Sequence, residues 1–364
     1  MVLYCIGWNL QKEFNYSKIY QAQTKISVVI AARNESANIQ KCLNSILAQN
    51  YPAHLFEIIL VDDHSTDNTA GMVRENFGEK VKIVSLSDFI FKDEKVISFK
   101  KRALAVGIEQ SEGALIVTTD ADCWMGEKWL STIAKFYETH SAEMIVAPVR
   151  FSSDRSLLQL FQSLDFLTMQ GITVATIRLR MGIMCNGANL AFSRAAFSAV
   201  NGYDGVDHLI SGDDYLLQSK IKQQYPDGVL YLKSKDAIVN TLPQESWAGF
   251  FNQRIRWASK TGKYKDPIMT VVLSMVYLFN LGLFISFVAG FVQFRFFMLF
   301  CIAGILKILF ELIFLFDVSR FFNRQKQLFY FPFFQPLHII YIILAGFLSR
   351  LGTFSWKQRS VKQN

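Results

Sequence analysis

Two pairs of aspartates stand directly after short apolar runs in the first third of the chain. Asp62 and Asp63 follow one such run, and Asp120 and Asp122 follow another. Carboxylates this close repel one another and raise each other's pKa unless a cation or hydrogen-bond donors offset their charge. Mg²⁺ typically takes one or two protein carboxylates together with substrate phosphate oxygens. The four aspartates therefore predict a divalent-cation site that binds a phosphate-bearing ligand.

The elements that must position these aspartates are short strands that alternate with helices. The runs with strand character are Ile26–Ala32, Phe56–Val61, Val81–Val84 and Ala114–Thr119, and those with helical length and period are Ala37–Ala48, Asn68–Phe77 and Lys100–Gln110. The strand runs are apolar on both faces, which is typical of parallel strands covered by helices. This alternation predicts an α/β fold with right-handed crossovers. Ligands in such sheets bind beyond the carboxyl ends of the strands, where both aspartate pairs stand.

Five motifs follow one another in the order of a known family. They are ISVVIAARNESANIQKCLNSILAQNYP, EIILVDDHSTDNT, TTDADCWMGEKWL, S-G-D-D-Y-L-L (Ser211–Leu217) and Q-R-I-R-W (Gln253–Trp257). Over roughly residues 25–265 the chain resembles the catalytic domain of family 2 glycosyltransferases. The last two motifs resemble the membrane-bound branch, which includes cellulose, chitin, hyaluronan and poly-N-acetylglucosamine synthases. The resemblance implies a GT-A type, Rossmann-like, mostly parallel sheet flanked by helices and followed by a helical transmembrane tail.

The resemblance also implies roles for the acidic residues at the strand ends. Asp63, with Asp62 beside it, would contact the uracil or ribose of a nucleotide-sugar donor. Asp122, helped by Asp120, would hold a Mg²⁺ or Mn²⁺ cofactor that bridges the donor diphosphate. Lys100 matches a lysine that the family uses near the phosphates; the alternative is that it solvates the start of a helix.

Two further aspartates stand where the family has its general base. Asp214 is the first choice for the carboxylate that takes a proton from the acceptor hydroxyl, and Asp213 replaces a glutamate seen in many relatives. A base of this kind needs hydrogen-bond reach to the hydroxyl. Asp213 as a supporting partner or a helix cap is the alternative. Direct displacement by one activated hydroxyl would invert the anomeric configuration.

The Q-R-I-R-W motif places three side chains on one face of a helix. Gln253, Arg256 and Trp257 stand at i, i+3 and i+4. A guanidinium can bind a diphosphate with two hydrogen bonds, and an indole can stack on an acceptor sugar. An amphipathic helix at the membrane interface explains the same residues, and one helix can serve both purposes. Farther up the chain, Asn186–Asn189 resembles the acceptor-side segment of the family or is a plain turn before a strand.

Long uncharged stretches predict a membrane protein. Residues 267–294 contain no charge over 28 residues, and residues 327–349 contain none over 23. About 20 apolar residues cross the hydrocarbon of a bilayer. Spans are predicted at about 269–292, 296–317 and 328–350. Lys307 and Glu311 of the second span are expected to form an ion pair within the helix, or alternatively a polar strip along an acceptor path. The net charge of +8 gathers beside these spans, which favours membrane headgroups over nucleic acid as the partner.

The resulting organisation has five parts. They are an interfacial lead-in at residues 1–24, a GT-A catalytic domain at 25–244 whose nucleotide-sugar half ends near 150, an interface helix at 245–266, the membrane segments at 267–352 and a basic tail at 353–364. The five scattered cysteines show no paired spacing, which predicts free thiols and a reducing compartment. We expect a multi-pass protein of a bacterial-type inner (plasma) membrane with its catalytic domain in the cytoplasm.

Together these features predict an inverting, metal-dependent glycosyltransferase of cell-envelope polysaccharide biosynthesis. It would move a sugar from a nucleotide-diphosphate donor, by preference a UDP-sugar, to a lipid-linked or growing polysaccharide acceptor at the membrane. A partner subunit or a homo-oligomer is an open way to complete a translocation path. Two other functions stay open. A sugar nucleotidyltransferase would use a glycine-rich loop after the first strand, where A-A-R-N-E has no glycine, and an inert membrane scaffold would keep only a degenerate nucleotide site.

Overall fold

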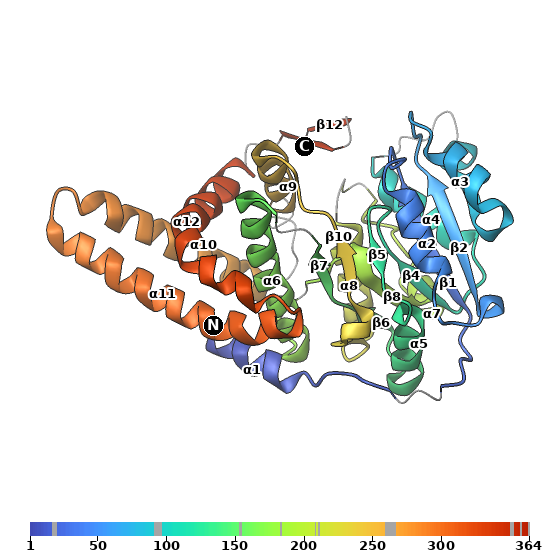
Figure 1. Cartoon of the computed structure of the whole chain (residues 1–364), viewed down its shortest axis with the longest axis horizontal. Helices are drawn as coiled ribbons and strands as arrows, with labels where there is room; N and C mark the ends of the chain where they lie inside the picture. The colour runs from blue at the N-terminus through green and yellow to red at the C-terminus, as the bar shows by residue number, and fades with distance from the viewer. Residues whose placement is uncertain are drawn as a thin grey trace. The chain divides into compact units, whose positions relative to one another are not determined.

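The computed structural model describes residues 1–16, 20–90, 97–152, 155–182, 184–207, 209, 212–258, 267–349, 353–356 and 359–362. These residues form two compact units (Figure 1). We call residues 11–150 and 183–242 the sheet unit, and residues 1–10, 151–182 and 243–364 the helical unit. Ser211 of the predicted S-G-D-D motif, residues 259–266 of the predicted interface helix and the side chains of the predicted basic tail lie outside the described residues.

The sheet unit is built on a seven-stranded sheet of order β3-β2-β1-β4-β8-β6-β9. Its strands are β1 (Ile26–Ala32), β2 (Phe56–Asp62), β3 (Lys82–Ser85), β4 (Leu115–Thr118), β6 (Met144–Val146), β8 (Leu190–Ser193) and β9 (Val229–Tyr231). The strands β3, β2, β1 and β4 run parallel, whereas β8 is antiparallel to β4 and β6. A second sheet joins β5 (Trp124–Met125), β10 (Val239–Thr241) and β7 (Val149–Phe151). The mostly parallel α/β fold is confirmed.

Helices connect and cover these strands. The α-helices are α2 (Ile39–Leu47), α3 (Thr69–Phe77), α4 (Phe99–Glu109), α5 (Trp129–His140), α7 (Arg194–Ala199) and α8 (Asp213–Gln224), and the 3₁₀ turns are η1 (Ala53–Leu55), η2 (Gly78–Lys80), η3 (Leu86–Phe89), η4 (Gly187–Asn189) and η5 (Lys235–Ala237). The strands and helices expected between residues 26 and 119 are confirmed, with ends that differ by at most two residues. The alternating apolar runs therefore sufficed to locate this half of the sheet.

Close packing of α4 on the sheet depends on a glycine. A Cβ atom at Gly107 would lie only 2.5 Å from Val29 Cγ1 and 3.0 Å from Val61 Cγ2. The absence of a side chain lets the helix backbone approach β1 and β2. The buried side chains Ala103 and Val106 of α4 then pack with Ile59, Val61 and Val84, and this core fixes the start of α4 next to the sheet edge.

The parallel register aligns the carboxyl ends of the central strands. On β1, Ala32 pairs with Asp62 of β2, and Val29 pairs with Thr118 of β4. Neighbouring strands lie about 4.8 Å apart, so the ends of β2 and β4 stand roughly 10 Å apart with β1 between them. This edge carries both predicted aspartate pairs.

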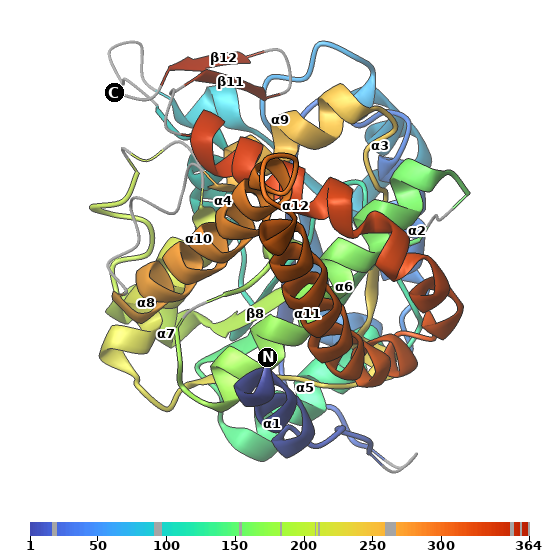
Figure 2. The same ribbon diagram turned by 90° about the vertical axis from the view of Figure 1, so that its left-hand side faces the viewer.

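The helical unit contains α1 (Val2–Leu10), α6 (Leu157–Arg178), α9 (Trp247–Ala258), α10 (Pro267–Ala289), α11 (Phe294–Phe321), the 3₁₀ turn η7 (Gln325–Tyr330), α12 (Phe331–Leu348) and the short strands β11 (Thr353–Trp356) and β12 (Arg359–Lys362). Figures 1 and 2 show α1 beside the end of α6. A Cβ atom at Gly7 of α1 would lie 2.8 Å from Ala175 of α6, so a glycine is needed for this contact.

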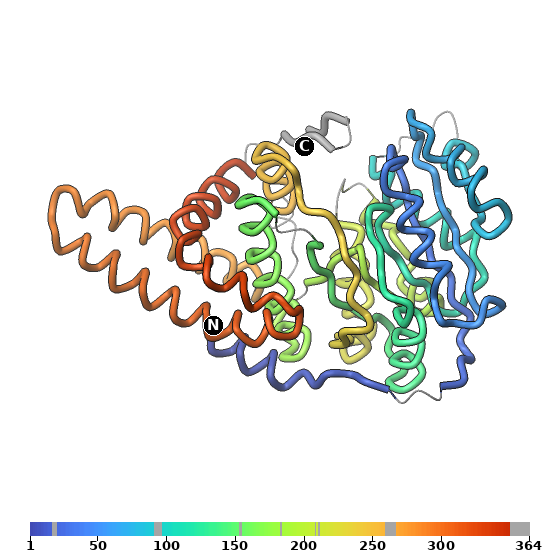
Figure 3. The backbone as a smooth tube through the Cα atoms, in the orientation of Figure 1, coloured from blue at the N-terminus to red at the C-terminus, as the bar shows by residue number. Residues whose placement is uncertain are grey.

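Three segments of the helical unit are long and apolar enough to cross a membrane. They are Pro267–Ala289, Phe294–Phe321 and Gln325–Leu348. The first two form a helical hairpin, visible in Figure 3 as two long helices joined by a tight turn. The predicted pair inside the second segment is confirmed, since Lys307 Nζ lies 2.7 Å from Glu311 Oε2. Gln335 of α12 donates a hydrogen bond of 3.1 Å to the same carboxylate oxygen, so the polar atoms satisfy one another.

Candidate active site

The loops that follow β1 and β2 are joined by hydrogen bonds. Asn34, in the left-handed region with φ 53°, donates from its backbone N–H to Ser65 Oγ over 3.1 Å and accepts at Oδ1 from the backbone N–H of Thr66 over 2.7 Å. Asparagine tolerates this backbone conformation better than most residues. Arg33 Nη1 donates to the backbone carbonyl of Asp63 over 2.8 Å. These bonds fix the loop that carries the first aspartate pair.

The two aspartates of this loop have different surroundings. Asp63 has a side chain only 3% exposed, its Oδ1 lies 3.0 Å from His64 Nδ1, and its backbone N–H donates to the carbonyl of Ala32. Asp62 accepts a long hydrogen bond of 3.4 Å from the Ser65 N–H at Oδ2, while its buried Oδ1 accepts none from the described residues. A buried oxygen without a partner costs free energy, so Asp62 has capacity for a ligand donor.

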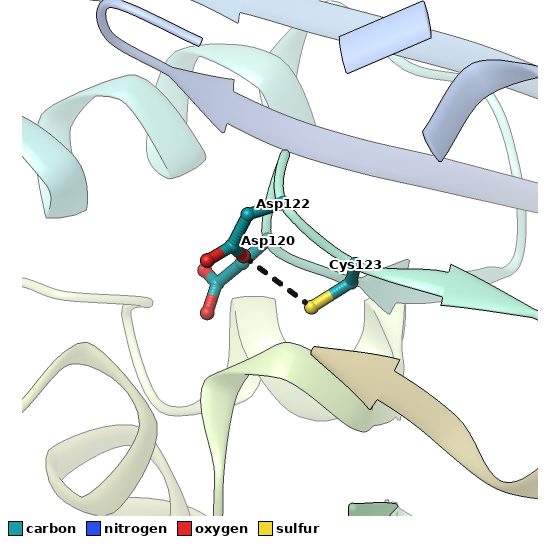
Figure 4. A group of neighbouring side chains, drawn as sticks. All are labelled: Asp120, Asp122 and Cys123. Atoms are coloured by element: carbon teal, nitrogen blue, oxygen red, sulfur yellow. Dashed lines mark hydrogen bonds between the residues drawn. The ribbon is translucent and has the colours of Figure 1, made fainter. Parts of the chain in front are cut away.

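The second aspartate pair stands in a turn just after β4. The backbone N–H of Cys123 donates to the carbonyl of Asp120 over 3.1 Å, which closes this turn. It brings carboxylate oxygens of Asp120 and Asp122 and the sulfur of Cys123 within 4.8 Å of one another (Figure 4). The Cys123 thiol donates to Asp122 Oδ1 over 3.5 Å. Three potential metal ligands therefore lie together at this strand end.

The carboxylates of this group suit a hard cation. Burial raises the pKa of the Cys123 thiol, and the charges of Asp122 and Asp120 raise it further. Because a thiol binds metal as the thiolate, Cys123 is a poor ligand in this protonated form. Carboxylate oxygens are the donors that Mg²⁺ and Mn²⁺ prefer. The group therefore fits the predicted cation, and Cys123 is a neighbour that sequence reasoning missed, although it directly follows Asp122.

Lys100, at the start of α4, joins acidic residues from two elements. Its Nζ lies 2.8 Å from Asp120 Oδ1 and 3.4 Å from Asp213 Oδ2. Burial alone would lower the pKa of Lys100, but Asp120 and Asp213 raise it well above its usual value. The ammonium is therefore charged throughout the physiological range. It connects the predicted metal site after β4 with the predicted base at the start of α8.

Both candidate bases occupy the first turn of α8. Acidic side chains are favourable there because of the exposed N–H groups and the helix dipole. The preceding residue, Gly212, has φ 91°, a conformation suited to glycine. Asp214 Oδ1 accepts from the backbone N–H of Tyr215 over 2.8 Å, and its Oδ2 accepts from that of Gly187 over 3.2 Å. These two bonds fix the orientation of the Asp214 carboxylate.

Gly187 lies among the charged groups. A Cβ atom there would stand 3.3 Å from Asp213 Oδ2 and 3.7 Å from Lys100 Nζ. The segment around Gly187 is held on the strand end, because Thr119 Oγ1 donates to the carbonyl of Ala188 over 2.9 Å. Asn186–Asn189 thus lies between β4 and α8, next to the candidate bases.

Asn189 in the same segment is buried and hydrogen-bonded within the protein. It is fully buried, it donates from Nδ2 to the carbonyls of Pro148 and Ala237, and it accepts from Trp129 Nε1 over 3.0 Å. Its hydrogen-bonding capacity is used within the protein. For this residue the structure favours the turn interpretation over contact with a ligand.

The residues of the Q-R-I-R-W motif lie on α9 of the helical unit. Within the expected helix, Trp247–Ala258 are helical, and this places Gln253, Arg256 and Trp257 at positions that share one face. The buried Gln253 Oε1 accepts no hydrogen bond within the described part of the chain. The indole of Trp257 packs against Phe166 of α6, with ring centroids 6.3 Å apart.

Comparison with known proteins identifies the domain. Residues 27–198 match the family model described as "Glycosyl transferase family 2". Glycosyltransferase AglE of Haloferax volcanii is 32% identical over 127 residues, which cover 35% of this chain and 40% of that protein. Poly-beta-1,6-N-acetyl-D-glucosamine synthase of Staphylococcus epidermidis is 26% identical over 258 residues, 68% of this chain and 58% of that protein. The chain thus spans about half the length of the curated relatives it matches.

A solved structure supports the same fold. Mannosyltransferase PcManGT from Pyrobaculum calidifontis, in complex with GDP-Man and Mn2+, aligns with a TM-score of 0.58 at 18% identity over 98% of this chain and 95% of that chain. Residues 27–198 therefore resemble a family 2 glycosyltransferase domain, as the sequence motifs predict, and the predicted fold is confirmed. The matching glycosyltransferases support the predicted class of transferase enzyme.

Proposed function

We propose that this protein is an inverting, metal-dependent glycosyltransferase that moves a sugar from a nucleoside-diphosphate donor to a lipid-linked or growing polysaccharide acceptor at a membrane. The observation that carries the proposal is the position of Lys100, whose ammonium contacts Asp120 on one side and Asp213 on the other. This contact supports a single site with metal ligands, a base and a fixed positive charge, as transfer from a diphosphate requires.

Asp62 and Asp63 are proposed to bind the nucleoside of the donor. The buried Oδ1 of Asp62, which accepts no hydrogen bond within the described residues, suits a ribose hydroxyl or a base N–H, and the buried Asp63 gives the loop a fixed shape. The mannosyltransferase PcManGT, which shares the fold, was solved with GDP-Man and Mn2+. The sequence motifs favour a UDP-sugar for this chain.

Asp122 and Asp120 are proposed to hold a Mg²⁺ or Mn²⁺ ion at their carboxylates. When bound, the ion supplies charge neutralisation for the leaving diphosphate. Lys100 adds a permanent positive charge beside the same group, because its pKa is raised by Asp120 and Asp213. The ammonium also reduces repulsion among the carboxylates before the donor binds.

Asp214 is proposed as the general base and Asp213 as its supporting neighbour. The acceptor hydroxyl loses its proton to the Asp214 carboxylate as its oxygen forms a bond to the anomeric carbon. The bond from that carbon to the diphosphate breaks at the same time, and the nucleoside diphosphate leaves with the electron pair. Attack from the side opposite the leaving group inverts the anomeric centre. Hydrogen bonds from the Tyr215 and Gly187 N–H groups hold Asp214 in a fixed orientation for this step.

Gln253, Arg256 and Trp257 are proposed to contact the donor diphosphate and the acceptor sugar. The buried Oε1 of Gln253, which accepts no hydrogen bond from the described residues, supports such a contact. The three apolar segments support a multi-pass position in a bacterial-type plasma membrane, with the catalytic domain (25–244) in the cytoplasm and the interface helix (245–266) beside the membrane. A partner subunit or a second copy of the chain is an additional proposed component of the assembly.

The direct test is to incubate membranes that contain the full chain with labelled nucleotide sugars and Mn²⁺, and then to separate lipid from polymer products. We expect label from a UDP-sugar in one of these fractions, and none from membranes carrying Asp214→Asn. Release of pyrophosphate from a nucleoside triphosphate and a sugar phosphate would instead indicate a sugar nucleotidyltransferase. Absence of UDP–Mn²⁺ binding by calorimetry would favour an inert scaffold and overturn the proposal.

A further inference from the structure

A buried ion pair inside the helical unit includes Arg254, the second residue of the Q-R-I-R-W motif. Arg254 Nη2 stands 2.8 Å from Asp165 Oδ2, with side chains only 2% and 6% exposed. Asp165 belongs to α6 and Arg254 to α9. His338 of α12 approaches the other carboxylate oxygen, with Nε2 at 3.7 Å. Asp165 therefore links three helices at a place where unpaired charge is strongly unfavourable.

The same arginine supports the tryptophan of the motif. The Arg254 guanidinium carbon lies 4.4 Å from the ring centre of Trp257 and 5.1 Å from that of Phe250. Its Nη1 also donates to Met169 Sδ over 3.2 Å, and Met169 stands one helical turn from Asp165 on α6. The planar group is thus held by α6 on its edge and by aromatic rings of α9 on its faces.

We infer that Asp165 and Arg254 are positioning residues that set the orientation of the Trp257 indole for the acceptor. This inference rests on the proposed function, in which Trp257 contacts the acceptor sugar. Asp165 fixes the guanidinium, the guanidinium stacks on the indole, and Phe166, the neighbour of Asp165, packs on that indole as well. An indole that can rotate presents a poorer surface for a sugar ring, so acceptor use falls while donor use is preserved.

The test compares two outcomes of one reaction in membranes that contain the full chain. The probe is a labelled UDP-sugar that the wild-type protein accepts. Transfer is measured as label in extracted lipid or polymer, and reaction with water as free labelled sugar. Loss of folded protein lowers both signals equally, whereas misplacement of Trp257 lowers transfer alone.

Asp165→Asn removes the charge and keeps the shape of the side chain. We expect transfer to fall about tenfold, equal to about 1.4 kcal/mol, with reaction with water and the donor KM within about twofold of wild type. Trp257→Ala should give a similar loss. The double variant Asp165→Asn with Trp257→Ala should be no worse than Trp257→Ala alone, because Asp165 acts through the indole.

Arg254→Lys is a second variant that tests the same inference if Asp165→Asn does not fold. It keeps a positive charge for Asp165 but lacks the planar group that stacks on Trp257. We expect a selective loss of transfer here too. Glu311→Gln is the matched control, since it also breaks a buried ion pair in the helical unit, with Lys307 rather than with α9. It should leave the ratio of transfer to reaction with water unchanged.

The results separate this inference from the proposed function. If wild-type membranes release no nucleoside diphosphate from any nucleotide sugar, the proposed function is wrong. If wild type transfers sugar, and Asp165→Asn and Arg254→Lys either keep normal transfer or lose both reactions equally, the positioning role is overturned. Additive losses in the double variant would also contradict it, because they would show that Asp165 and Trp257 act independently.

Discussion

The sheet unit and the helical unit both hold clusters of acidic and basic side chains, but the two kinds of cluster differ in exposure. In the sheet unit, the side chains of Lys100 and Asp120 are 27% and 38% exposed. In the helical unit, those of Arg254 and Asp165 are 2% and 6% exposed. Groups open to solvent can exchange water for a ligand, whereas buried groups are fixed on one another. The exposed cluster is thus suited to binding, and the buried one to holding helices.

Among changes in the exposed cluster, replacement of the proposed base should lower the rate of sugar transfer the most. Asp214→Asn keeps one oxygen, which can accept from the N–H group of either Gly187 or Tyr215, but its amide cannot accept the proton of the acceptor hydroxyl. We expect kcat to fall about 10²- to 10⁴-fold with donor affinity near normal. Initial rates of transfer and calorimetry with UDP measure the two quantities. Substantial remaining turnover would refute the role of Asp214.

Asp236→Asn is the matched control for that variant. Asp236 is an aspartate of the same unit with a side chain 45% exposed, and it lies 3.6 Å from Lys128. Its replacement should leave kcat unchanged. A comparable loss of kcat in both variants would show that any missing carboxylate harms the unit, and that the effect at Asp214 is not specific.

Substitutions that break the buried ion pairs should lower the stability of the folded protein. Glu311→Gln leaves the Lys307 ammonium without its carboxylate between α11 and α12. Breaking a buried pair in this way typically costs about 3–5 kcal/mol of folding free energy. The unfolding temperature of the detergent-solubilised protein should fall clearly. The exposed pair Lys25–Glu112 provides the contrast, and Glu112→Gln should leave that temperature within error of wild type. Equal shifts would remove the distinction between the two kinds of cluster.

The metal ligands provide a third comparison. Asp122→Ala removes one of the two carboxylates that lie together after β4. A charge-assisted contact contributes about 1.5–3 kcal/mol, so UDP affinity in the presence of Mn²⁺ should fall about 10- to 100-fold. Without a divalent ion, wild type and variant should bind UDP equally weakly. Calorimetry with and without Mn²⁺ measures this, and an unchanged Mn²⁺ dependence would contradict the assignment.

The strands of the sheet unit could be predicted from the sequence, whereas the contacts between distant residues in both units could not. The run Ile26–Ala32 is apolar except for Ser27, and similar runs follow it along the chain, so local patterning located β1 and the strands beside it. The contact of Lys100 with Asp213 joins residues more than a hundred positions apart, and only the assembled fold brings them together. The same is true of Asp165 and Arg254, whose pairing depends on how two helices pack rather than on any spacing within one.

Cys123 and Gly187 show a second limit of sequence reasoning. Cys123 directly follows Asp122, but its position beside the carboxylates depends on its burial, and the sequence around it does not show that burial. The sequence indicates only that Gly187 belongs to a turn. The distances from a Cβ atom at this position to Asp213 and Lys100 show that a side chain there would enter the charged cluster. The sequence shows which residue types are present and how they are spaced, whereas the packing of the folded chain decides which of their atoms stay accessible.

The smallest expected effect concerns Asp67, an exposed carboxylate. Asp67 accepts from the Thr69 N–H over 3.0 Å and from the Ser36 N–H over 3.1 Å, and so ties the start of α3 to the loop after β1. Burial would raise the pKa of Asp67, but the bonds from Thr69 and Ser36 outweigh it and lower the pKa to about 2. A carboxylate with a lowered folded pKa stabilises the protein above its unfolded pKa, near 3.9, and this contribution is lost as the pH falls toward 2.

Asp67→Asn should therefore lower the unfolding temperature slightly at pH 6, and the gap from wild type should narrow as the pH falls below about 4. The gap is small because solvent screens an exposed group. Unfolding temperatures of both proteins at several pH values between 6 and 3 measure it. A gap that is constant with pH would mean that the amide loses packing or geometry rather than charge. A gap that widens in acid would contradict the lowered pKa, because the charge of Asp67 would then oppose folding at neutral pH.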